Sequence, residues 1–406
     1  MRNKVLKYIN DGLEKTKRYN PENKGNLIGL PKPYNVPSVS GAFQEMYYWD
    51  TYFLNRGLIL LGNTEQAKNN TDNMLYLVEK YGFMPNGNRT YYLHNSQPPF
   101  LSMMIDDIFS VTGDTEWLYG AYKTLEKEYA FWQNERNTEI GLNQYTGNRK
   151  MAVDEKMFEG FLRRIGNRPE GHTDEHLSWQ YVAICESGWD INPRFDYHIE
   201  DFVPVELNAL LYAFEKNMAK FSDALGLPCG EDWNTKAASR LEKMNKYLLK
   251  DGIYFDYDFK NGVISDKFTC ASYYPMMVGM LDERKANALT ENLKRLETVY
   301  GVAVTEKAYD ADKYNYQWQY PNGWAPLYDV ILQGLTKYGF ISKAKEIANK
   351  YVNLVENNFE KTGNLWEKYN VVTGGVDVRE EGSGEMPAMI GWTAGVYLDA
   401  LKIIEE

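Results

Sequence analysis

The 406-residue chain carries 45 lysines and arginines against 56 aspartates and glutamates, a net charge of −11, which argues against nucleic acid or a membrane surface as its partner. Hydrophobic residues make up 44% and charged residues 25%, as in chains that fold around a sizeable core. Three cysteines are too few and odd in number for a disulfide framework, and the first 25 residues lack a long apolar stretch. These features predict a cytoplasmic protein.

Apolar residues recur at every third or fourth position along almost the whole chain, which is the spacing of one face of an α-helix. In chain order, helices are expected at 47–62, 64–81, 97–111, 114–133, 174–185, 202–225, 232–249, 265–281, 283–298, 324–338, 341–358 and 387–403. Residues 252–263 instead alternate around an Asn-Gly pair, which predicts a β-hairpin.

The domain organisation is expected to be simple, because no Pro/Gly/Ser-rich linker, low-complexity tract or long charge run divides the chain. We therefore predict one domain over residues 1–406. Twelve helices of similar length suit six helical hairpins closed into a toroid, but an irregular helical bundle has the same pattern along the sequence.

Tryptophans next to polar side chains are the most informative feature of the sequence. They occur in YYWD at 47–50, SGWD at 187–190, QWQYPNGW at 317–324, LWEK at 365–368 and IGW at 390–392. An aromatic face beside a carboxylate or amide suits a sugar, whose C–H face packs on the ring while its hydroxyls form hydrogen bonds. One such cluster is more often a core aromatic beside a helix cap, but five together favour a carbohydrate site.

Cleavage of a glycosidic bond needs a proton donor on the leaving oxygen and a second carboxylate on the other side. Asp190 lies in a turn directly after Gly188 and Trp189, where an aromatic ring can desolvate the acid. Glu385 lies in the glycine-containing segment GSGEMP, where Glu380 and Glu381 compete for the same role.

Other motifs give weaker signals. His172 and His176 are four residues apart and could bind a metal, but no third ligand is spaced for it, so no metal site is predicted. Cys185 is most simply a small buried residue. The sequence has no nucleotide-binding, zinc-protease or serine-hydrolase motif.

Several longer stretches resemble the trehalase family of glycoside hydrolases. AFQEMYYWDTYF at 42–53 is similar to the family signature PGGRFxExYxWDxY, and YQWQYPNGWAP at 316–326 is similar to QWDxPNGWAP. Further similar segments follow in the family's order: GFMPNGNRTYYLHNSQPPF at 82–100, NRPE at 167–170, ESGWD at 186–190, VPVELNALLY at 203–212 and WEKYN at 366–370. The resemblance spans about residues 40–400.

This resemblance implies an all-α (α/α)6 toroid of six helical hairpins, with the short β-hairpin as an addition. It also implies an inverting hydrolase of a small oligosaccharide or glycoside that uses no metal or organic cofactor. Asp190 takes the position of the general acid and Glu385 that of the general base. The positions expected to bind the sugar are Phe43, Tyr48, Trp49, Asp50, Asn86, Arg89, Gln97, Arg168, Glu170, Gln317, Trp318, Gln319 and Trp392.

The sequence departs from the family pattern at three places. Ala42 replaces an arginine, Gln319 replaces the aspartate of QWD, and the glycine-rich segment around Glu385 is two residues shorter. The leading hypothesis is therefore an exo-acting hydrolase that releases glucose from trehalose or from another small α-glucoside. The alternatives are a related toroidal α-glucosidase or glycosylglycerate-type hydrolase, and a sugar-binding toroid without catalytic activity.

Overall fold

The computed structural model describes residues 1–153, 155–378 and 386–406. Its α-helices are α1 (Arg2–Lys15), α2 (Tyr48–Leu60), α3 (Thr64–Tyr81), α4 (Leu101–Thr112), α5 (Thr115–Glu135), α6 (Glu155–Ile165), α7 (Asp174–Glu186), α8 (Val205–Ala224), α9 (Gly230–Tyr247), α10 (Tyr274–Met277), α11 (Glu283–Asn292), α12 (Ala325–Lys337), α13 (Ile341–Thr362) and α14 (Gly391–Glu405). The strands have two or three residues each: β1 (Lys17–Arg18), β2 (Tyr34–Asn35), β3 (Phe202–Val203), β4 (Leu249–Lys250), β5 (Ile253–Tyr254), β6 (Tyr257–Asp258), β7 (Val263–Ile264), β8 (Asn322–Trp324) and β9 (Lys368–Asn370).

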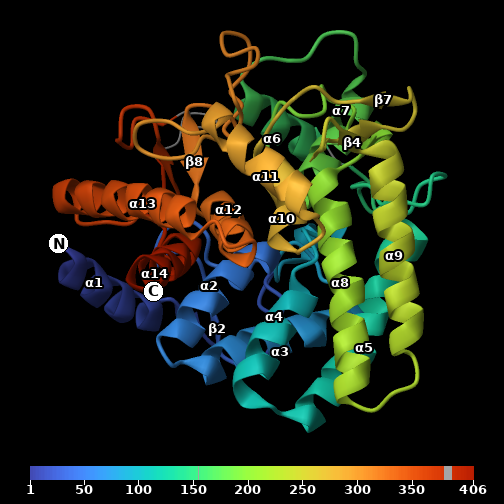
Figure 1. Ribbon diagram of the computed structural model, residues 1–406, viewed down its shortest axis with the longest axis horizontal. Helices are drawn as coiled ribbons and strands as arrows, with labels where there is room; N and C mark the ends of the chain where they lie inside the picture. The colour runs from blue at the N-terminus through green and yellow to red at the C-terminus, as the bar shows by residue number, and fades with distance from the viewer. Residues whose placement is uncertain (154, 379–385) are drawn as a thin grey trace.

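Six of the described helices form a closed inner ring. Each packs on the next in the order α2, α4, α8, α10, α12 and α14, and α14 returns to α2. The helices α1, α3, α5, α9, α11 and α13 alternate with them along the chain, and α1, α9 and α13 lie at the periphery of the molecule (Figure 1). This arrangement confirms the predicted (α/α)6 toroid.

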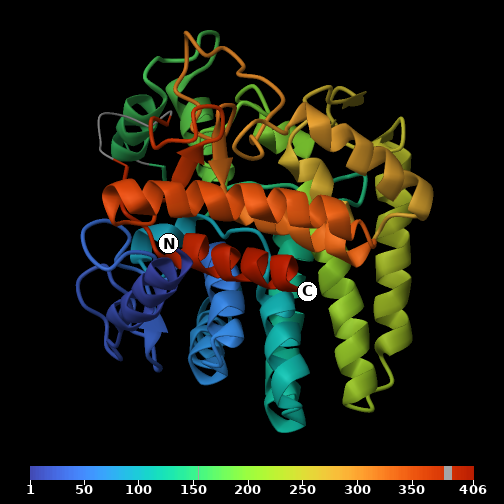
Figure 2. The ribbon, with the colours of Figure 1, turned by 60° about the vertical axis from the view of Figure 1, so that its left-hand side comes forward.

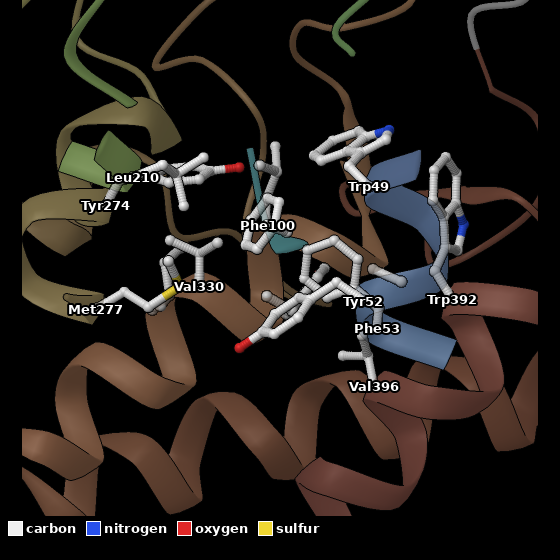
Figure 3. Close-up of a cluster of buried hydrophobic side chains, with 14 of the residues drawn as sticks. Trp49, Tyr52, Phe53, Phe100, Leu210, Tyr274, Met277, Val330, Trp392 and Val396 are labelled. Carbon is white, nitrogen blue, oxygen red and sulfur yellow. The ribbon is translucent and has the colours of Figure 1, made fainter. Parts of the chain in front are cut away.

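The axis of the ring is filled with hydrophobic side chains from all six inner helices or the residues just before them (Figure 3). Tyr52 from α2 stacks on Phe100, which precedes α4, with 4.5 Å between ring centroids. The other side chains labelled in this layer are Trp49, Phe53, Leu210, Tyr274, Met277, Val330, Trp392 and Val396. The toroid is therefore a packed core rather than a pore along its axis.

The ring closes where two glycines let the first and last inner helices approach closely. A Cβ atom on Gly395 of α14 would lie 2.0 Å from the carbonyl oxygen of Phe53, and a Cβ on Gly57 would lie 2.7 Å from the Cα of Gly395. No side chain fits between these backbones, so α2 and α14 pack at a distance that only glycine permits.

Three segments differ from the expected helices. The helices α1 and α6 were not predicted, and only short helical segments occur within 265–281, at 270–273 and 274–277. Pro275 lies in the first turn of α10, which suits proline because the first amides of a helix need no intrahelical acceptor. Gly279 then has a positive φ of 79°, which ends the helical segment.

The predicted β-hairpin is confirmed in its second half. β6 and β7 pair antiparallel around Asn261 and Gly262, with Tyr257 opposite Ile264. β5, however, pairs with β4, and β6 also pairs with β3. The hairpin belongs to the layer of loops and short strands that covers one end of the ring, seen at the top of Figure 2.

The buried carboxyl group of Glu128 predicts that the stability of the protein depends on pH. Glu128 of α5 is fully buried and accepts a hydrogen bond from the hydroxyl of Tyr48, and burial raises its pKa from near 4.5 to about 8. The folded state keeps a proton that the unfolded state loses, so the free energy of unfolding should fall as pH rises from about 4.5 to 8 and level off above.

Chemical denaturation of Glu128→Gln at several pH values tests this expectation. The variant should lack this contribution, whose slope is at most about 1.4 kcal/mol per pH unit. Glu126→Gln on the exposed face of the same helix is the matched control and should follow the parent protein. Parallel pH profiles for the parent and Glu128→Gln would contradict the assignment.

Candidate active site

A cavity of about 590 Å³ opens at the end of the ring where the inner helices α2, α12 and α14 begin. Its wall also includes residues of α6 and α7 and of the loops before α4, β8 and β9. The described side chains that line it and matter for the chemistry are Phe43, Trp49, Asp50, Asn86, Gln97, Lys156, Arg163, Arg164, Tyr181, Asp190, Gln317, Trp318, Trp324, Glu367, Met389 and Trp392.

The cavity rests on a group of five packed tryptophans. Trp318 stacks on Trp324 at 3.7 Å and on Trp189 at 5.6 Å between ring centroids. Trp49 and Trp392 pack edge to face at 5.9 Å and complete the group. These residues come from four of the five tryptophan clusters noted in the sequence, so the pattern does mark one site. Buried aromatic rings give a sugar a rigid apolar surface.

The turn before Asp190 requires glycine for two reasons. Gly188 has a φ of 73°, in the left-handed region that other residues seldom adopt. A Cβ on Gly188 would also lie 2.8 Å from Cε2 of Trp49. The sequence Gly188-Trp189-Asp190 thus turns the chain directly against the tryptophan group and brings Asp190 to the cavity.

Gly188→Ala is therefore expected to displace Trp49 and lower both the melting temperature and kcat/KM. The left-handed conformation alone costs about 1–2 kcal/mol, and the contact with Trp49 adds to this. Gly171→Ala is the matched control, since Gly171 has a φ of 81° but open space around it. Calorimetry and kinetics on both variants measure the difference, and equal effects would rule out the contact with Trp49 as the cause.

Among the described residues, three carboxyl groups share the cavity wall: Asp50, Asp190 and Glu367. Asp50 is 9% exposed, and its burial raises its pKa well above the ordinary value, with further increases from the charges of Glu367 and Asp190. A protonated Asp50 can donate a hydrogen bond to a sugar hydroxyl. Asp190 is more accessible, with 29% of its side chain exposed.

Basic groups hold two of these carboxylates in place. Nη2 of Arg164 donates to Oδ2 of Asp190 at 2.9 Å, while its Nη1 donates to the hydroxyl of Tyr181. Nζ of Lys368 donates to Oε2 of Glu367 at 2.6 Å and to Oε1 of Gln317 at 3.3 Å. Charge-assisted hydrogen bonds of this kind fix the direction of a carboxylate more firmly than neutral ones do.

Buried ion pairs support the site from below. Arg194 binds both Glu206 and Asp256, and its guanidinium lies 4.6 Å from the ring centre of Trp189. Glu186, at the end of α7, accepts two hydrogen bonds from Arg136. It also accepts the backbone N–H groups of Ser96 and Thr146, and so links α7 to the loop that carries Gln97.

Asn86 and Gln97 both line the cavity. Oδ1 of Asn86 is buried and has no hydrogen-bond partner within the described part of the chain. Gln97 is instead partly engaged, because its Oε1 accepts the backbone N–H of Trp49 at 3.2 Å. The amide of Asn86 must therefore turn before its oxygen can accept a hydrogen bond from a ligand.

Most of the residues expected at the site line the cavity. They are Phe43, Trp49, Asp50, Asn86, Gln97, Asp190, Gln317, Trp318 and Trp392. Glu385 and its competitors Glu380 and Glu381 lie outside the described residues.

Five expected residues are placed away from the cavity wall. Tyr48 is buried against Glu128, and Arg89 pairs with Glu45 and Asn26. Arg168 pairs with Asp174, Glu170 is exposed, and the Oε1 of Gln319 accepts the N–H of Tyr309. Tyr48, Arg89 and Gln319 belong to motifs that reach the cavity, but their own side chains contact other partners. No residue of the NRPE motif at 167–170 lines the cavity.

The sequence reasoning missed two groups that line the cavity. Glu367 belongs to the LWEK cluster, which was noted for its tryptophan. In the fold it is the glutamate, and not the tryptophan, that lines the cavity. Lys156, Arg163 and Arg164 come from α6, a helix that was not predicted although Phe161 and Ile165 have the required spacing. Basic residues on an exposed helix are common, so no local signal placed them at a site.

Comparison with known proteins assigns the chain to a family. The family model described as Trehalase matches residues 3–405. The chain belongs to the trehalase family. It is 33% identical over 408 residues to a periplasmic trehalase of Xanthomonas oryzae and 34% identical over 411 residues to one of Pseudomonas aeruginosa. These matches cover 93% of this chain and 69% and 72% of the relatives.

Solved structures agree with this assignment to the trehalase family. The neutral trehalase Nth1 of Saccharomyces cerevisiae has a TM-score of 0.77 at 25% identity, covering 95% of this chain and 76% of that one. A GH63 mannosylglycerate hydrolase of Thermus thermophilus has a TM-score of 0.66 at 14% identity, covering 97% and 98%. The second likeness shows a shared fold. As a member of the trehalase family, the chain is a glycoside hydrolase that acts on α-glucosides.

The same relatives correct the predicted location. Trehalases aligned over 93% or more of this chain are named periplasmic, which points to the periplasm rather than the cytoplasm. Cysteine number could not decide this, because Cys185, Cys229 and Cys270 form no disulfide and a chain without disulfides can be stable in either compartment. Across the described residues, no helix combines the length and apolar content needed to cross a bilayer.

Proposed function

We propose that residues 1–406 form one catalytic domain that hydrolyses a small α-glucoside with inversion, with Asp190 as general acid and Glu385 as general base. The observation that carries this proposal is the position of Asp190 at the edge of a tryptophan-floored cavity, held by Arg164. Asp190 gives its proton to the leaving oxygen while the base takes one from the attacking water.

The cavity supports binding of a terminal glucosyl unit. The tryptophan group provides an apolar floor, and Asp50, Asn86 and Gln97 present hydrogen-bonding groups above it. In an inverting enzyme the two carboxyl groups stand about 6.5–9.5 Å apart, so that a water fits between the base and the anomeric carbon. Met389, four residues after Glu385 in the sequence, lines the same cavity.

Trehalose is the first substrate to test, because the relatives above are named trehalases. The departure at Ala42 lies next to Phe43 in the cavity wall, whereas Gln319 lies outside it. Alanine at position 42 cannot form the hydrogen bonds that the family's arginine offers a sugar. We therefore expect kcat/KM to be lower for trehalose than for another α-glucoside.

A second substrate class is favoured by one observation. Lys156, Arg163 and Arg164 of α6 give the cavity wall a basic side, and Arg164 pairs with Asp190. A basic wall attracts an anionic leaving group such as the glycerate of glucosylglycerate. Arg163→Gln should then raise KM for glucosylglycerate and leave KM for trehalose unchanged.

Glucose release from trehalose, other α-glucosides and glucosylglycerate tests the proposal. From trehalose, inversion should give equal amounts of β- and α-glucose, seen by NMR before mutarotation, because the leaving glucose keeps its α-configuration. Release of α-glucose alone from trehalose, or of α-glucose from any other α-glucoside, would overturn inversion. Binding of these sugars by calorimetry without any release would instead indicate a sugar-binding toroid without catalytic activity.

A further inference from the structure

Three histidines converge on one side of the molecule, away from the residues that line the cavity. His172 lies before α7, His176 lies in its first turn, and His198 lies more than twenty residues further along the chain. Their ring centroids are 4.9, 4.9 and 5.1 Å apart. Sequence spacing identified only the first two, because the fold supplies the third.

One nitrogen from each of these rings lies within 4.8 Å of the others. We propose that His172, His176 and His198 form a binding site for a divalent transition metal of the zinc class, with water completing the coordination. Three imidazoles are a donor set that suits zinc, copper or nickel better than calcium or magnesium, which prefer oxygen ligands.

The outer contacts of the rings fit this role. A metal-bound histidine commonly gives its second nitrogen to a carbonyl or carboxylate, which fixes the ring. Nε2 of His176 lies 2.9 Å from the carbonyl oxygen of Tyr197, and Nδ1 of His198 lies 3.4 Å from a carboxylate oxygen of Asp201. These contacts leave Nδ1 of His176 and Nε2 of His198 for a metal.

The rings must rotate before they can share one ion, because His172 and His176 are stacked with 10° between their planes. Zinc–nitrogen bonds of about 2.0–2.1 Å in a tetrahedron place the nitrogens about 3.3 Å apart, so the rings must close by about 1.5 Å. All three histidines are partly exposed, so their side chains have room to rotate and an ion has access. The backbone that leads into His198 is held in an unusual form, with positive φ at Asp196 and Tyr197.

The position of the site indicates a structural role rather than a catalytic one. None of the three histidines lines the described wall of the cavity. A metal there would tie the start of α7 to the segment that follows Asp190, and α7 ends four residues before Asp190. The ion is therefore expected to stabilise this wall, and the hydrolysis needs no step through it.

Metal titration of the full chain tests the inference. After dialysis against a chelator, calorimetry with Zn²⁺ should show one equivalent bound. His172→Gln, His176→Gln and His198→Gln should each weaken binding by at least about 10–100-fold, since even loss of an outer partner has that effect. His94→Gln, the only histidine outside the cluster, is the matched control for metal affinity and should bind as the parent does.

Two further readouts separate this site from other sources of metal binding. Zn²⁺ should raise the melting temperature of the parent protein but not that of His198→Gln. Co²⁺ should give visible bands of a nitrogen and oxygen site without a thiolate charge-transfer band. Absence of binding, affinity equal to that of the parent in the three histidine variants, or a thiolate band that depends on Cys185 or Cys229 would each overturn the inference.

Discussion

Asp190→Asn is expected to lower kcat for α-glucoside hydrolysis by about 10²–10⁴-fold, the usual contribution of a general acid. Asparagine keeps an oxygen that can accept the hydrogen bond from Arg164, so the turn and the binding of the sugar should remain. Steady-state kinetics together with substrate binding by calorimetry measure the two effects separately.

The nature of the substrate sharpens this test. Fluoride leaves without protonation. Asp190→Asn should therefore lose far less activity on α-glucosyl fluoride than on trehalose. The matched control is Asp196→Asn, because the side chain of Asp196 is 71% exposed and does not line the cavity. Near-full activity of Asp190→Asn on trehalose, or an equal loss on both substrates, would remove Asp190 from the role of proton donor.

Glu385→Gln is expected to cause a loss of similar size, because without a general base the water attacks unassisted. Glu381→Gln and Glu380→Gln should keep measurable activity, since only Glu385 has the Gly-Glu-x-Pro context of the family. These three isosteric changes within six residues serve as controls for one another, and kcat on one substrate ranks them.

Added azide gives an independent readout for the base. A small anion can replace the activated water in Glu385→Gln and form a β-glucosyl azide, whereas it cannot replace the missing proton donor in Asp190→Asn. Rescue of Glu381→Gln but not Glu385→Gln, or the reverse ranking of activities, would show that another glutamate of the segment is the base.

Helical periodicity predicted most of the fold, but not its closure. The amphipathic spacing located the helices because each buries one face. The choice between toroid and bundle depends on the contact between Gly57 and Gly395, which are far apart in the chain and carry no pattern that links them. Local regularity cannot encode such a contact, and it was the family resemblance that implied the toroid.

The sequence predicted site residues that are recognised by their type, but not which way a given side chain points in the fold. Tryptophan beside a polar group marked Trp49, Trp189 and Trp318, and the fold packs these rings against one another. Arg168 lies in a family motif, yet its guanidinium pairs with Asp174. His198 joined His172 and His176 only through the folded chain.

The closure of α14 on α2 also determines when the site can exist during folding. Trp49 lies near the start of the ring and Trp392 near its end, and they touch across more than 340 residues of intervening chain. Loop closure over such a span is slow compared with pairing of neighbouring helices. A growing chain can therefore stack its hairpins early, but the sugar pocket becomes complete only when its last helix has joined the first.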